Sequence, residues 1–222
     1  MTIFKYLMLS FGLSFLIMST AQAKESLFCS NQLLSHPIPK GNTWTLTSRL
    51  GKILSIAEKE FGERDKSWTI LGIEFTDAEQ PSIWYPFGYK AKNIIIQLTR
   101  NTSRNELKAL YQLAHEVFHT LSPNAEVKTN MLEEGLATYF SIKALQEMGF
   151  KISPQYIAAK KYKKAYQLVA QLYKKHPETS QLIQSLRRQE LKLSELSADD
   201  IKIFFSNIDQ GLARQLANKF DP

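Results

Sequence analysis

The chain has 222 residues, of which 44% are hydrophobic and 22% are charged, and its formal net charge is +7. This composition excludes an intrinsically disordered protein and favours a normally packed globular one. A single cysteine, Cys29, excludes an internal disulfide. The basic charge balance favours acidic surfaces or substrates only weakly.

Residues 1–23 have the three parts of an export signal. Lys5 lies near the start, an apolar run follows it, and Ala21 and Ala23 form a small-x-small cleavage site. The apolar run is short for a membrane span, and no second run follows. We therefore expect an exported, periplasmic or extracellular protein that starts at about Lys24 and has no stable membrane insertion after signal removal.

A helix and then a small sheet are predicted next along the chain. Apolar residues recur at helical spacing over Leu46–Phe61, and Gly62 follows as a stop signal. Three short segments rich in β-branched and aromatic residues are separated by turn signals and predict strands. They are WTILGIEF (68–75), SIWY (82–85) and KNIIIQLT (92–99).

Two longer helices are predicted after the sheet. Ser103 and Glu106 have the S-x-x-E spacing of a capping box, and the helix that they begin carries an apolar face as far as Leu121. Asn130 is predicted to cap the next helix, which Gly149 ends.

Further helices are predicted to start at Pro154, at Pro177 and at Ser197, and the first of them is expected to reach about Lys175. This order predicts an α+β fold with a small mixed or antiparallel sheet and a helical C-terminal part. We expect one domain after the signal, residues 24–222, with the sheet and the chemistry-bearing helices in about 42–150 and the helical part in about 151–222.

The predicted helix from Ser103 contains the segment LAHEVFHTL. Its two histidines, His115 and His119, are four residues apart and project from one helix face. Their imidazole nitrogens can close on one Zn²⁺ at about 2.0–2.1 Å each, while Glu116 points beside them toward a metal-bound water. This HExxH pattern arises by chance in roughly one such chain in two hundred. The alternative is a pair of buried histidines bonded to backbone or water, with a solvated Glu116.

The segment MLEEGLATYF (131–140) offers the third ligand that a catalytic zinc site needs. Burying an ionised carboxylate without a partner is costly, so its adjacent glutamates need something to bind. With Asn130 as the helix cap, Glu133 occupies the third helical position, where its carboxylate can reach back to the cap's backbone N–H. Glu134 is one position further round the helix and is free to face the two histidines. We therefore assign Glu134 as the third ligand, with one position left open for water.

These residues resemble the gluzincin metallopeptidases, in which HExxH is followed on a second helix by a ligand glutamate. The likeness is carried by His115, Glu116, His119, Glu134 and the run EGLATY, and it covers roughly residues 92–145. In the branch that includes the membrane-alanyl aminopeptidases, the ligand glutamate directly precedes a glycine, which favours Glu134 over Glu133. The resemblance implies a zincin-like fold, one Zn²⁺ per chain and hydrolysis of peptide or protein substrates.

Two features differ from the large aminopeptidases of that group. Fourteen residues separate His119 from Glu134, which is fewer, and no G-x-M-E-N sequence lies upstream to hold a free amino group. Aminopeptidase specificity is therefore not expected. KNIIIQLT lies where similar enzymes have an edge strand that aligns an extended peptide, and the alternative is an ordinary sheet strand.

The resemblance also implies supporting roles for residues after the ligand glutamate. Thr138 lies one turn after Glu134, where similar enzymes place a side chain that supports the first histidine. Its alternative is a helical threonine bonded to its own preceding turn. Similar enzymes take an oxyanion donor from the downstream segment, where the candidates are Tyr156, Tyr162, Tyr166 and His176. The alternatives are core packing for the tyrosines and a helix end for His176.

The run AKKYKKAYQLVAQLYKKH combines lysines with aromatic residues, as nucleic-acid or membrane-surface patches do. Helical phasing places its apolar residues on one face and most of its lysines toward solvent. A solvated face and export both argue against a nucleic-acid partner.

The sequence therefore predicts an exported zinc metallopeptidase, with Glu116 as the general base that moves a proton from the metal-activated water to the leaving amine. One alternative is a catalytically inactive, zinc-stabilised envelope protein with a binding or structural role. A second is a basic surface-binding module without metal.

Overall fold

The computed structural model describes residues 35–37, 43–125 and 127–221. The predicted export signal and Cys29 lie outside these residues. Internal contacts define one compact unit, Leu46–Pro222, and a separate unit, Met1–Thr45. In the latter, strands β1 (Ser35–Pro37) and β2 (Thr43–Thr45) pair antiparallel. No helix in the described ranges has both the length and the apolar character needed to cross a membrane.

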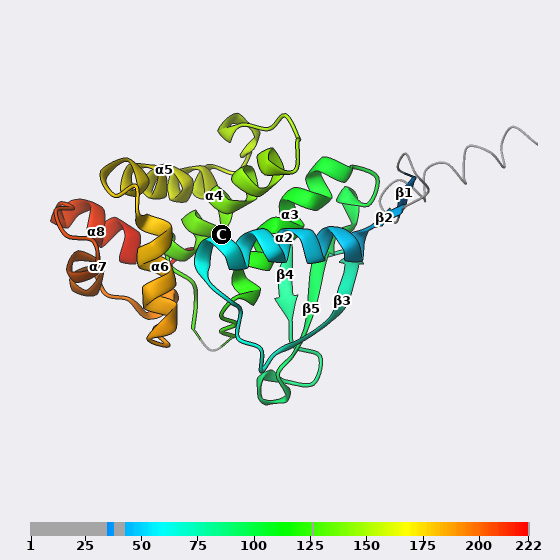
Figure 1. The fold of residues 1–222 in the computed structure, drawn as a ribbon, viewed down its shortest axis with the longest axis horizontal. Coiled ribbons are helices and arrows are strands. Elements are labelled where there is room, and N and C mark those ends of the chain that lie inside the picture. Colours follow the sequence, from blue (N-terminus) through cyan, green and yellow to red (C-terminus); the bar gives the residue numbers. More distant parts are fainter. Residues whose placement is uncertain (1–34, 38–42, 126, 222) are drawn as a thin grey trace, which may run out of the picture. The chain divides into compact units, whose positions relative to one another are not determined.

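The larger unit begins with α2 (Leu46–Phe61), whose predicted bounds are confirmed. Gly62 follows it with a φ of +86°, a conformation that glycine adopts without strain. The sheet has three strands, in the order β3 (Thr69–Thr76), β5 (Asn93–Thr99), β4 (Ser82–Trp84) (Figure 1). β3 is parallel to β5 and β4 is antiparallel to it, so the sheet is mixed.

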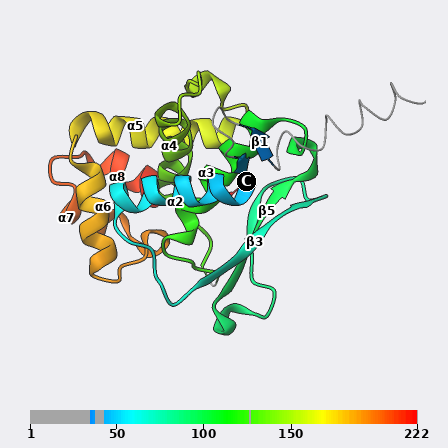
Figure 2. The same cartoon turned by 45° about the vertical axis from the view of Figure 1, so that its right-hand side comes forward.

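Strand β5 is the central strand, because it pairs on both sides. The interpretation of KNIIIQLT as a substrate-aligning edge strand is therefore wrong, and its alternative, an ordinary sheet strand, is confirmed. Ile94, Ile96 and Leu98 alternate along β5 and are fully buried. They form the covered face of the sheet, against which α2 and α3 (Glu106–Thr120) pack (Figure 2). Strand β4 is left at one edge.

The cap of helix α3 is Asn105, two residues after the predicted cap Ser103. Asn105, in an extended conformation, accepts a hydrogen bond from the backbone N–H of Lys108. Ser103 has helical backbone angles and closes the preceding 3₁₀ turn, η2 (Arg100–Thr102). The predicted capping box at Ser103 is therefore wrong, because the chain is still turning at that residue.

The cap of α4 (Met131–Glu147) is as predicted, since the Asn130 side chain accepts from the backbone N–H of Glu133. Gly149 follows the helix with a φ of +90°. In the helical part, Pro154 begins a 3₁₀ turn, and the long helix predicted from this residue starts only at Lys160 but ends at Lys175, as expected. The elements there are η3 (Pro154–Tyr156), α5 (Lys160–Lys175), α6 (Thr179–Arg188), η4 (Leu193–Glu195), α7 (Ala198–Phe204) and α8 (Gln210–Ala217). The helix α8 was not predicted, and Asp209 caps it. The α+β class is confirmed.

Candidate metal centre

The helices α3 and α4 pack side by side and bring three ligand-type side chains together. The ligand atoms of His115, His119 and Glu134 all lie within 4.8 Å of one another. His115 Nε2 is 3.1 Å from Glu134 Oε2, and His119 Nε2 is 3.6 Å from Glu134 Oε1. His115 and Glu134 are 5% and 6% exposed. This buried cluster can hold a metal ion.

The sequence positions these groups by two local rules. His115 and His119 are one turn apart on α3, and their Nε2 atoms are 3.4 Å apart. Glu134 lies in the first turn of α4, where the helix dipole favours a negative charge. The contact between the two helices then places this carboxylate opposite the imidazoles.

Glu133 does not use its carboxylate as a helix cap, which corrects the role that the sequence assigned to it. His119 Nδ1 donates to Glu133 Oε1 across 2.9 Å. Glu133 and Glu134 both face α3. The Glu133 carboxylate therefore reaches Nδ1 of His119, whose side chain is largely buried. In a neutral His119 with its proton on Nδ1, the Nε2 lone pair would face the cluster, as a metal ligand requires.

Glu116 is 4% exposed, so the alternative in which this residue is solvated is excluded. Burial raises the pKa of Glu116; the charges of His115 and His119 oppose the shift, and that of Glu134 adds to it. A carboxylate with a raised pKa beside a ligand cluster is suited to accepting and releasing a proton.

The charges of the cluster are strongly coupled. Burial acts to raise the pKa of Glu134, but the charge of His119 and the hydrogen bond from His115 hold it at about 2. A hydrogen bond from the Thr129 side chain contributes to the same shift. Burial acts to lower the pKa of His119, but Glu134 and Glu133 raise it to about 10.

Thr138 bonds its own preceding helical turn, which was the alternative to supporting a histidine. Its hydroxyl donates to the backbone carbonyl of Glu134 across 2.8 Å, and the residue is fully buried. The bond that the structure shows for this hydroxyl therefore runs along α4, and the visible support of an imidazole comes from Glu133.

Of the four oxyanion candidates, Tyr162 on α5 lies against the cluster. Its ring centroid is 5.4 Å from that of His115, with the ring planes nearly perpendicular. Burial raises the pKa of Tyr162, and the charges of Glu134 and Glu116 add to the effect. Its hydroxyl donates to Gln80 Oε1, 3.3 Å away and just upstream of β4.

The other three candidates pack elsewhere. Tyr156 places its ring edge on Tyr111, and its hydroxyl is buried without a hydrogen-bond partner. Tyr166 stacks on Tyr139, as expected for core packing. His176 bonds Glu178 and packs against Phe205 at the end of α5, so its alternative role as a helix-end residue is confirmed.

Tyr85 lies near the cluster and was not singled out in the sequence. It directly follows β4, and its pKa is raised by burial and by the charges of Tyr89, Glu133 and Glu116. Its ring packs against Trp68 and Tyr89. Its place at the end of the run SIWY was the only available signal, and that run also fits an ordinary strand.

Gly135, the glycine of the EG pair, is required by packing. A Cβ at this position would lie 2.5 Å from the backbone oxygen of Ala165 and 2.5 Å from Val169 Cγ2, both on α5. The absence of a side chain lets α5 approach α4 closely enough for Tyr162 to reach His115.

Comparisons of the chain with protein-family models, curated proteins and solved structures found no match. A functional assignment therefore depends on the geometry and chemistry of this site.

Proposed function

We propose that this protein is an exported zinc-dependent peptidase of gluzincin type. His115, His119 and Glu134 hold one Zn²⁺ per chain, and Glu116 is the general base. The observation that carries the proposal is the convergence of three ligand-type side chains within 4.8 Å, next to a buried glutamate on the same helix as the histidines. The substrate is a peptide or protein.

The donor set favours zinc. Two imidazoles and one carboxylate are the ligands of hydrolytic zinc sites, which keep a fourth position for water. Sites for Mg²⁺ or Ca²⁺ use oxygen ligands throughout, and two of the three donors here are nitrogens. A bound Zn²⁺ would supply an activated water at neutral pH and a Lewis acid for the scissile carbonyl.

The residues of the chain provide the other requirements of peptide hydrolysis. Glu116 accepts the proton of the attacking water and delivers it to the leaving amine. Glu133 fixes the tautomer and orientation of His119. The hydroxyl of Tyr162 is the donor best placed to stabilise an oxyanion.

The edge strand of the sheet supports a zincin-like arrangement. Strand β4 is antiparallel to β5, contacts α3, and has no strand on its outer side among the described residues. An extended peptide can bind such an edge through main-chain hydrogen bonds. We therefore expect the substrate strand to bind beside β4, in the role that the sequence analysis had given to KNIIIQLT.

One observation favours the alternative of an inactive, zinc-stabilised envelope protein. The Tyr162 hydroxyl is engaged with Gln80 rather than directed at the cluster. Catalysis requires this hydrogen bond to be exchanged when substrate binds. A protein in which it persists would hold metal without hydrolysing peptides.

The experiment compares zinc content and peptide hydrolysis in Glu134→Ala, Glu116→Gln and the matched control Glu147→Gln, an exposed change on α4. We expect Glu134→Ala to lose both zinc and hydrolysis. Glu116→Gln should keep zinc and lose hydrolysis by about 10²–10⁴-fold, and Glu147→Gln should keep both. Full turnover in Glu116→Gln would contradict the proposed mechanism. Zinc in the wild type without cleavage of any peptide in a diverse library would support the inactive alternative.

A further inference from the structure

The segment Asn218–Asp221, termed here the clasp segment, follows α8 and packs on the start of α4. The backbone N–H of Met131 donates to the carbonyl of Asn218, and that of Phe220 donates to Thr129, each across 2.9 Å. Asn130 and Lys219 form an antiparallel β-bridge between these two bonds. The clasp segment therefore fixes the backbone that leads into the helix of Glu134.

These bonds reach α4, the helix of Glu134, at its first turn, where backbone N–H groups need hydrogen-bond partners from outside the helix. The first backbone N–H groups of any helix lack partners within the helix, and Met131 is the first residue of α4. The carbonyl of Asn218 satisfies this N–H. The clasp segment therefore holds the first turn of the helix that carries Glu134.

The side chain of Phe220 reaches the other end of the cluster. It is 2% exposed, and its ring centroid is 4.8 Å from that of Tyr162. The Tyr162 ring in turn lies 5.4 Å from the ring of His115. Three rings therefore form a continuous row from the clasp segment to a metal-ligand imidazole.

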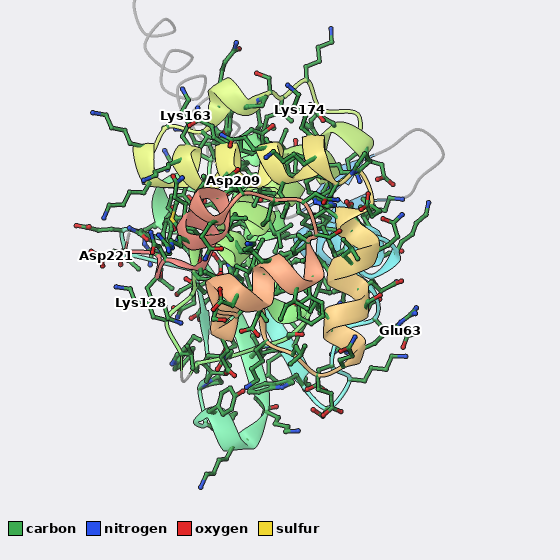
Figure 3. All side chains as sticks on the ribbon, turned by 90° about the vertical axis from the view of Figure 1, so that its left-hand side faces the viewer. Glu63, Lys128, Lys163, Lys174, Asp209 and Asp221 are labelled. Atoms are coloured by element: carbon green, nitrogen blue, oxygen red, sulfur yellow. The ribbon has the colours of Figure 1, made fainter. Side chains whose placement is uncertain are left out.

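Polar side chains anchor the clasp segment on both sides of Phe220. The ammonium group of Lys219 donates to the carbonyls of Ser194 and Lys128, at 2.7 and 3.1 Å. Lys128 also pairs with Asp221, and both side chains lie at the surface (Figure 3). Exposed pairs contribute little stability, so the buried ring and the backbone bonds carry most of the anchoring.

We propose that the clasp segment is a positioning element of the metal centre, with Phe220 as its positioning residue. It acts on His115 through the ring of Tyr162, and on Glu134 through the first turn of α4. This inference rests on the proposed zinc site. A residue that only filled the core would affect stability and leave metal affinity unchanged.

The test measures zinc affinity by competition with a chromophoric chelator, together with the visible spectrum of the Co²⁺-substituted protein. Phe220→Ala should weaken zinc binding about tenfold and alter the Co²⁺ spectrum, since groups that orient metal ligands affect affinity by about 10–100-fold. Leu216→Ala is the control, because this fully buried residue of α8 also loses core volume. It should lower the unfolding temperature without changing zinc affinity.

Conservative variants separate positioning from folding. Phe220→Tyr keeps the aromatic ring, and Phe220 lines an open pocket of about 220 Å³. We expect Phe220→Tyr to retain wild-type affinity. Phe220→Leu, which preserves most of the volume but not the ring, should give an intermediate affinity and serves as the milder variant if Phe220→Ala does not fold.

A double-mutant cycle tests the route through Tyr162. In a Tyr162→Ala background, Phe220→Ala should cause a clearly smaller further loss of zinc affinity than it does in the wild type. Full additivity, or equal affinities for wild type, Phe220→Ala and Phe220→Leu, would overturn the inference while leaving the proposed zinc site intact. A wild type that binds no zinc would overturn both.

Discussion

Replacing Gly135 by alanine should destabilise the protein, although alanine is the better helix former. The added Cβ would meet the backbone oxygen of Ala165 and a methyl group of Val169 at 2.5 Å, whereas ordinary contact begins at 3.4 Å. The carbonyl belongs to the backbone of α5 and the methyl group to a stiff, fully buried side chain. Neither obstacle can rotate away, so α4 and α5 must separate by up to about 0.9 Å, which forfeits a quarter to a half of each close contact.

The expected magnitude follows from two opposing effects. Overpacking a core costs about 1–3 kcal/mol, and exchanging a helical glycine for alanine gains about 0.8–1.0 kcal/mol. With two fixed obstacles we take the upper half of the first range. The net loss in the free energy of unfolding is then about 1–2 kcal/mol, or about 2–8 °C in the unfolding temperature of a domain of this size.

Thermal and urea unfolding followed by circular dichroism measure this loss. The matched control is Gly51→Ala on α2, where an added Cβ meets nothing within 4 Å. That exposed change should raise the free energy of unfolding by about 0.5–1 kcal/mol. If the Gly135→Ala protein were as stable as the Gly51→Ala protein, the close approach of α5 to α4 would not explain why position 135 is a glycine.

Three further results are expected. Glu133→Gln removes the carboxylate that holds His119 Nδ1 and should weaken zinc binding by about 10–100-fold in chelator competition; affinity equal to wild type would contradict this positioning role. Arg187→Met removes a guanidinium that donates to the carbonyls ending α2 and α3, and whose pKa burial lowers to about 10. It should cost about 3 kcal/mol in urea unfolding, against about 0.5 kcal/mol or less for its exposed neighbour in Arg188→Met. Zinc at a thousandfold excess over its dissociation constant should add about 4 kcal/mol and raise the unfolding temperature by about 8–16 °C; a shift that persists in His119→Ala would place the metal elsewhere.

Helix ends could be predicted from the sequence where a glycine or a capping side chain marks them. The glycines after α2 and α4 and the Asn130 cap were readable because each one satisfies a backbone requirement within a few residues. The start of α3 was misplaced because Ser103 and Asn105 are both good caps, and only the preceding 3₁₀ turn distinguishes them. The helix predicted from Pro154 to about Lys175 ends as expected but starts later, at Lys160, because a proline that suits a first helical position can begin only a 3₁₀ turn.

For the site residues, too, some roles could be predicted from the sequence and others could not. Their spacing alone brought His115, Glu116 and His119 to one helix, and the EG pair indicated which glutamate faces them. The role of Glu133 could not be read from the sequence, because a carboxylate at the third helical position can reach its own cap or a neighbouring helix. Because α4 packs against α3, the Glu133 carboxylate bonds His119 rather than its own helix cap.

The sequence by itself determined the helix of the two histidines, the capped helix that carries the glutamates and the α+β order of elements, because these depend on periodicity and on bonds between residues close in the chain. Only the tertiary structure decided that β5 is central, that Tyr162 alone of four candidates lies against His115, and that Phe220 packs on Tyr162. These are contacts between segments far apart in sequence, and they are set by how complete helices and strands bury their apolar faces against one another.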